Sequence, residues 1–132
     1  MFSANASPSK QYQSMDIESA IANAQPATLV VMLFDGVIRN INEAMLATRA
    51  GNIEAKGLAI GKAIRILEEG LRASLDRKIG QFSNHLNDLY LYIGDKLLAA
   101  HLRNDVSLLD EALSLLTPIR DAWRSVEKRS PQ

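Results

Sequence analysis

Apolar residues recur at steps of three and four along residues 26–50, and this run passes straight through the pair Asp35-Gly36. At about 100° per residue, such spacing gathers them into one stripe along a helix. An Asp-Gly pair between apolar runs is also typical of a β-hairpin turn, but "LVVMLF" before it does not alternate as a strand would. The pattern therefore predicts one helix that begins at Pro26 and ends at Gly51-Asn52. Its stripe consists of Val30, Leu33, Phe34, Val37, Ile41, Ala44 and Met45.

The Asp35-Gly36 pair needs its own explanation within such a helix. Asp35 falls on the side opposite the apolar stripe. Gly36 weakens a helix by about 1 kcal/mol relative to alanine. We therefore expect a close backbone approach or a local contact at Gly36.

The same periodicity predicts three further helices. They are expected over residues 53–77, 81–103 and 106–127, with short turns between them. Pro118 lies inside the last helix and removes a backbone hydrogen bond to Ser114, so a kink is expected there. Four helices with short connections predict an all-α fold, an antiparallel four-helix bundle spanning residues 26–128.

The first 25 residues are predicted to form a mobile arm that carries a short extra helix. Residues 1–14 are polar, as mobile arms commonly are. Apolar residues at helical spacing follow Asp16, the expected N-cap, and Pro26 separates them from the bundle. These apolar residues are Ile17, Ala20, Ile21 and Ala24. Residues 129–132 are expected to form a tail.

Two of the predicted helices carry more apolar surface than one inward stripe needs. Leu91, Leu98 and Leu102 share a line on the third helix, roughly 150° from its main stripe and bordered by polar residues. Leu108 and Leu115 lie toward one edge of the fourth helix. Either the N-terminal helix with Ile17 and Ile21 covers this surface, or it is a groove for the amphipathic helices of a partner. Both interpretations hold if the N-terminal segment covers the surface and a partner displaces it.

Composition excludes several classes of function. The chain has 132 residues, enough for one domain, and 15 basic against 15 acidic side chains. Zero net charge argues against a nucleic-acid module and against electrostatic membrane binding. No apolar run is long enough to span a membrane, and no signal peptide is visible. The absence of cysteine fits the cytoplasm.

No chemistry-bearing cluster stands out either. The chain has no cysteine, and its histidines, His85 and His101, are about 160° apart on one helix, too far around it to share a metal. Serines are plentiful, but none forms an evident catalytic grouping with histidine and aspartate. We therefore expect no enzyme activity, no metal and no cofactor.

Four blocks of sequence resemble the FliS family of flagellar secretion chaperones. They are "QPATLVVMLFDGVI", "ASLD", "NDLYLYIGDKLLAAHLRNDVSLLDEALSLL" and "RDAWRSV", in that order along the chain. Family members carry a similar P-x-x-L-I-x-M-L-Y-D-G block, an L-Y-x-Y block leading into R-L-x-x-A-N, and A-W near the end. The chain departs from this pattern at Phe34, at His101, at Gly94-Asp95 and at Pro118.

The resemblance implies an antiparallel helical bundle in the cytoplasm that binds the disordered C-terminal region of flagellin. Such binding would stop premature polymerisation and keep flagellin competent for flagellar type III export. It also implies contacts with the flagellar export gate and, in some members, with an anti-sigma factor. A monomer or a weak homodimer is expected. The alternative is a bundle that associates with its own copies and has no chaperone role.

The family resemblance and the apolar pattern each indicate partner-binding residues. The resemblance points to Tyr12 in the arm and to Asp35 in the first block. The apolar pattern adds Ile17, Ile21, Leu91, Leu98, Leu102, Leu108 and Leu115.

Overall fold

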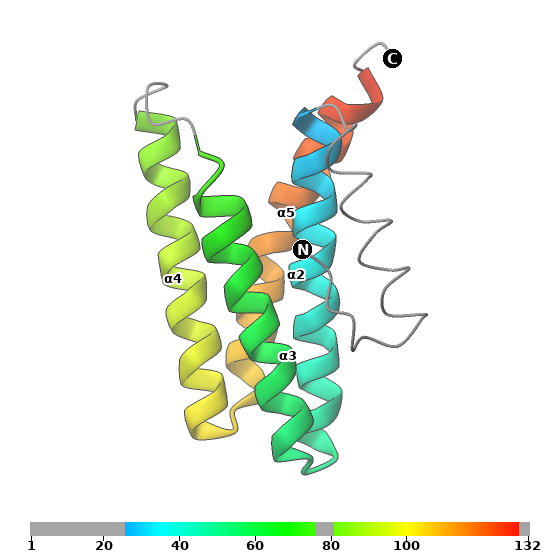
Figure 1. The fold of residues 1–132 in the computed structure, drawn as a ribbon, viewed down its shortest axis with the longest axis vertical. Helices are drawn as coiled ribbons and strands as arrows, with labels where there is room; N and C mark the ends of the chain where they lie inside the picture. The colour runs from blue at the N-terminus through cyan, green and yellow to red at the C-terminus, as the bar shows by residue number, and fades with distance from the viewer. Residues whose placement is uncertain (1–25, 76–80, 130–132) are drawn as a thin grey trace, which may run out of the picture.

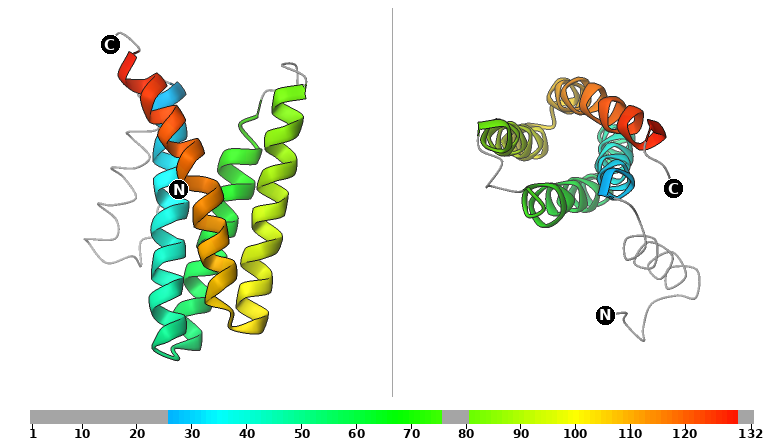
Figure 2. Two further views of the ribbon diagram at one scale, coloured as in Figure 1. Left: turned by 180° about the vertical axis from the view of Figure 1, so that it is seen from behind. Right: turned by 90° about the horizontal axis from the view of Figure 1, so that it is seen from above.

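The computed structural model of the chain describes residues 26–75 and 81–129. Its helices are α2 (Pro26–Arg49), α3 (Ile53–Arg65), the π-helix η1 (Ile66–Arg72) that continues α3, α4 (Gln81–Arg103) and α5 (Val106–Arg129). They form an antiparallel bundle in which each helix lies beside the next and α5 returns to α2 (Figure 1, Figure 2). The described residues contain no strand. The all-α prediction is therefore confirmed, whereas the predicted N-terminal arm, with Tyr12, Ile17 and Ile21, lies outside the described residues.

The first predicted helix is confirmed, and a hairpin at Asp35-Gly36 is excluded because α2 runs through the pair. The close approach expected at Gly36 is also present. A Cβ atom there would lie 3.2 Å from Cδ1 of Ile66 on η1. The Gly36 carbonyl also accepts a buried hydrogen bond of 2.8 Å from Nδ2 of Asn40. Glycine thus lets α2 and η1 pack closely at this level.

The turn after α2 uses the residues that end a helix. Gly51 adopts φ 71°, a conformation that glycine reaches without steric cost. Asn52 then caps α3, because its Oδ1 accepts a hydrogen bond of 3.0 Å from the backbone N–H of Ala55.

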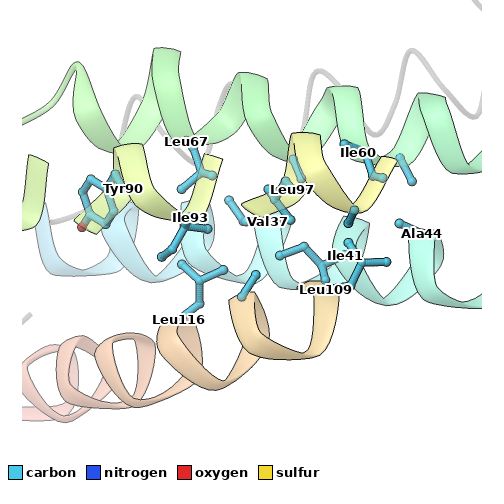
Figure 3. Packing of buried hydrophobic residues seen from close by; sticks show 14 of the residues in the cluster. Val37, Ile41, Ala44, Ile60, Leu67, Tyr90, Ile93, Leu97, Leu109 and Leu116 are labelled. Carbon is cyan, nitrogen blue, oxygen red and sulfur yellow. The ribbon is translucent and has the colours of Figure 1, made fainter. Parts of the chain in front are cut away.

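The predicted inward stripes meet in one core. Phe34, Val37 and Ile41 of α2 are fully buried. Val37 and Ile41 lie among side chains of the other three helices (Figure 3). Phe34 packs edge-to-face on Tyr90 of α4, with 6.1 Å between ring centroids. The other helices contribute Ala59, Ile60, Ala63, Leu67, Leu71, Tyr90, Ile93, Leu97, Ala100, Leu109, Ala112 and Leu116.

The second predicted helix is wrong in its C-terminal part. Instead of an α-helix to Arg77, the chain becomes π-helical at Ile66 and leaves helical geometry after Arg72. The Ala73 N–H donates to the carbonyl of Glu68, five residues back, at 3.2 Å. Here Gly70 lies so close to α2 that a Cβ would be 3.0 Å from Cδ2 of Leu33. Apolar spacing did not predict the π turns, since Leu67 and Leu71 remain buried within them.

The fourth predicted helix is confirmed, since α5 continues through Pro118. All of its fully buried residues precede that proline: Leu109, Ala112 and Leu116. Ile119 and Trp123, beyond it, pack only partly against the core. The kink stays a prediction.

Burial of Tyr90 has a measurable consequence at alkaline pH. Burial raises the pKa of its hydroxyl to about 12, from an ordinary value of 10.0. The folded chain therefore holds this proton more tightly than the unfolded chain, so stability is lost as the pH rises from 10 through 12. Between pH 10 and pH 12 we expect the free energy of unfolding, measured with urea, to fall by roughly 2 kcal/mol less in Tyr90→Phe than in wild type. Equal losses in the two proteins would contradict this.

Candidate partner-binding surface

Three leucines of α4 are exposed to solvent, although another face of the same helix already contributes its apolar residues to the core. Leu91, Leu98 and Leu102 are 40%, 50% and 71% exposed. They recur at steps of seven and four, so they lie along one line of α4, here named the leucine strip. The prediction that core packing does not enclose them is confirmed.

Contacts of neighbouring residues show which edge of α4 carries the leucine strip. Asn87 accepts a hydrogen bond of 2.8 Å from Nε of Arg72 on η1. Cε1 of His101 lies 3.3 Å from the position a Cβ would take on Gly57 of α3. Asn87 and His101 therefore mark the side of α4 that faces α3 and η1, and the leucine strip lies beside it on the outer side. The strip thus borders the seam between α3 and α4, two helices that lie side by side (Figure 1).

The opposite edge of α4 is tied to α5. The Tyr92 hydroxyl donates to Oε2 of Glu111 at 2.7 Å, and Lys96 Nζ lies 3.7 Å from Oε1 of the same carboxylate. The Lys96 ammonium also lies 5.0 Å from the centroid of the Tyr92 ring. The Tyr92 hydroxyl and the Glu111 charge raise the pKa of Lys96. Because Lys96 is about 160° around the helix from Leu98, the leucine strip faces away from α5.

The structure does not bring Leu108 and Leu115 to the leucine strip. Both lie on α5, partly buried and packed against the core. A helical wheel puts them on the Glu111 edge of α5, which meets the other edge of α4. The predicted apolar contacts therefore separate into one open strip on α4 and a half-buried pair on α5.

Asp35 joins α2 to α5. Its Oδ1 accepts a hydrogen bond of 2.8 Å from Nη1 of Arg120, and its Oδ2 lies 3.3 Å from Nη2 of Arg124. The bond from Asp35 raises the pKa of the Arg120 guanidinium. Asp35 lies outside the core as expected. It is not a free surface carboxylate, because it is half-buried and forms ion pairs with two arginines of α5.

We expect Asp35→Asn to lower the free energy of unfolding by about 1 kcal/mol in low salt and by less in high salt. The reason is that Arg120 and Arg124 lose the charge that pairs them with α2. The control is Asp121→Asn, because Asp121 is more exposed and bonds Arg120 from within α5, at 2.8 Å. Equal effects of the two variants in urea unfolding would contradict a stabilising role for the ion pairs between Asp35 and α5.

Lys56 was missed by sequence reasoning. It is 3% exposed, and its Nζ donates to the carbonyl of His101 at 2.9 Å and to Oδ1 of Asn104. Asn104 has φ 53°, a left-handed position just past a helix end. A lysine of α3 thus caps the C-terminal end of α4. Asp105 then begins α5, accepting 2.9 Å from the Ser107 N–H, and the bonds from Ser107 lower its pKa.

The three most exposed apolar residues outside the leucine strip were not expected. Ile53 falls in line with the inward residues of its helix, yet it is 68% exposed because it is the first residue of α3, where the core ends. Leu46 is 66% exposed and lies about 180° around α2 from the buried Val37. Leu58 is similarly exposed, on the outer side of α3. Position at a helix end was the sequence signal that could have identified Ile53.

Two other features are absent from the described part of the chain. Residues 26–75 and 81–129 hold no group of three or more histidine, aspartate or glutamate side chains placed to bind a metal. Their helices include none with the length and apolar character needed to cross a bilayer.

Comparisons with known proteins agree on one family. The family model described as "Flagellar protein FliS" matches residues 8–130. The flagellar secretion chaperone FliS of Salmonella typhimurium is 40% identical over 126 residues, which cover 95% of this chain and 93% of that protein. The Escherichia coli protein of the same name is 42% identical, over 86% and 84% of the two chains. The flagellar secretion chaperone FliSB of Pseudomonas aeruginosa is 37% identical, over 89% and 93%.

Proposed function

The chain belongs to the FliS family of flagellar secretion chaperones, and on this premise we propose that it binds the disordered C-terminal region of flagellin in the cytoplasm. Binding would prevent premature polymerisation and keep flagellin competent for flagellar type III secretion. The observation that supports this most strongly is the leucine strip. Leu91, Leu98 and Leu102 are exposed on a bundle whose core is complete without them.

The mechanism is occupancy of an apolar surface. A disordered segment that becomes helical on the leucine strip hides apolar area and gives up its conformational freedom at the same moment. The ordering entropy is offset by the length of surface that the segment covers. No bond is made or broken, which agrees with a family of chaperones.

The family resemblance also implies two further partners. We propose that the loaded chaperone docks at the flagellar export gate, and that an anti-sigma factor is a secondary partner. The anti-sigma factor is expected to compete with a flagellin C-terminal peptide if it uses the leucine strip. The export gate must act on the loaded chaperone, so it is expected to bind without displacing the peptide.

The test of the proposed function is titration with a peptide of the flagellin C-terminal region, followed by calorimetry and light scattering. We expect the peptide to bind the chaperone saturably. Light scattering should show a monomer of the chaperone, or a weak dimer that the peptide dissociates. A stable dimer that ignores the peptide would contradict the proposal and favour the self-associating bundle.

We propose further that the N-terminal arm shields the apolar surface part of the time and is displaced by the partner. If Tyr12, Ile17 and Ile21 act as a lid, deletion of residues 1–22 removes a competitor for the leucine strip. We expect the deletion variant to bind the flagellin peptide about threefold or more tightly, and to bind more of an apolar dye. An unchanged affinity together with unchanged dye fluorescence would contradict a lid.

A further inference from the structure

The seam between α3 and α4 is held at two levels, and Gly94 lies midway between them. At one level Arg72 bonds Asn87, and at the other Gly57 meets His101. Gly94 is seven residues from both Asn87 and His101, so it lies on the same line of α4 and faces α3. Because the helices are antiparallel, these pairings place Gly94 opposite residues 64 and 65.

The space above Gly94 is open. A Cβ on Gly94 would meet no atom within 4 Å, and the same holds for Gly61 on α3. The other glycines of α2, α3 and η1 are closely covered, by Ile66 at Gly36, by His101 at Gly57 and by Leu33 at Gly70. The middle of the seam is therefore hollowed where the two ends are filled.

Apolar side chains wall this opening, and acidic residues border it on α4. Leu91 and Leu98 lie one turn to either side of Gly94, and the partly buried Ile64 lies across from it. Asp88 and Asp95 are exposed on the outer side of α4, beyond the leucine strip. The opening is therefore apolar at its centre and acidic along its α4 side. We name this feature the Gly94 window.

We propose that the Gly94 window receives a large apolar side chain from one amphipathic helix of the bound flagellin segment, which makes Gly94 a residue that determines specificity. This inference rests on the proposed function. The charges on α4 favour a helix with basic residues toward Asp88 and Asp95. A helix with acidic residues there would place like charges together.

The chain has no cysteine, so a single introduced thiol reports on this position alone. We expect the Gly94→Cys thiol to react freely with a disulfide reagent in the free protein, and about tenfold or more slowly with saturating flagellin C-terminal peptide. The matched control is Asn42→Cys on the exposed side of α2, whose reaction rate should not change. Equal rates at residue 94 with and without bound peptide would overturn the inference.

Two substitutions test the window without labelling. Gly94→Ala should raise the melting temperature by about 2 to 5 °C, because alanine favours a helix and its Cβ has room. Gly94→Leu should weaken peptide binding by about tenfold or more, since its side chain occupies the window. Asn42→Leu adds the same side chain elsewhere and should leave affinity unchanged. If wild type binds and Gly94→Leu binds equally or more tightly, the window is wrong; if wild type does not bind, the proposed function is wrong.

Discussion

Replacing Leu98 with aspartate is expected to weaken binding of the flagellin C-terminal peptide by about tenfold or more. Leu98 is half exposed at the centre of the leucine strip, so a carboxylate there must lose water when the partner helix covers it. Because the side chain does not contribute to the core of the free bundle, far-UV helicity and the melting temperature should stay close to wild type. Calorimetric titration gives the affinity, and circular dichroism gives the fold.

Leu46→Asp is the matched control for this experiment. It places the same charge on an exposed leucine of α2 that faces away from the seam between α3 and α4. We expect the affinity of Leu46→Asp to equal that of wild type. If Leu98→Asp also bound the peptide as wild type does, the leucine strip would not be part of the site.

The second large effect concerns stability. Phe34→Ala is expected to lower the free energy of unfolding by about 3 to 5 kcal/mol, because the ring is fully buried and packs edge-to-face on Tyr90. Neighbouring helices can fill only part of the cavity that remains. Urea unfolding measures the loss, and Leu46→Ala, at an exposed position of the same helix, should change stability by less than about 0.5 kcal/mol. A loss below about 1 kcal/mol for Phe34→Ala would contradict the core as described.

The fold was predictable where one helix repeats a pattern. The stripe containing Phe34, Val37 and Ile41 identified α2 despite the hairpin-like Asp35-Gly36, because the periodicity extends over many residues and the turn signal over two. The sequence placed the cap of α5 at Asn104 or Asp105, and the structure assigns it to Asp105, whose partner Ser107 lies two residues away. These features depend on local sequence alone.

Features that depend on contacts between helices were not predictable. Lys56 has the character of a surface lysine in sequence, and only the antiparallel pairing of α3 with α4 brings it to the His101 carbonyl and Asn104. The π-helical turn at Gly70 arises where Leu33 of α2 approaches. Likewise, a wheel shows that Leu108 and Leu115 lie at an edge of α5 but not that this edge packs partly against the core.

The leucine strip was predictable because both of its properties are local. Leu91, Leu98 and Leu102 share a line, and that line is too far around α4 from the inward stripe to reach the core. The Gly94 window was not predictable, because the space above a glycine depends on which side chains the neighbouring helix places there.

The central claim is that a foreign chain covers apolar helix surface that the bundle itself leaves exposed. Leucine methyl resonances, recorded with a soluble paramagnetic agent, measure the exposure of each leucine directly. On adding flagellin C-terminal peptide to saturation, we expect the methyl groups of Leu91, Leu98 and Leu102 to become protected, while those of Leu46 and Leu58 stay accessible. If the three leucines of the strip were as accessible in the saturated complex as in the free protein, the bound segment would not cover them and the proposed binding surface would be wrong.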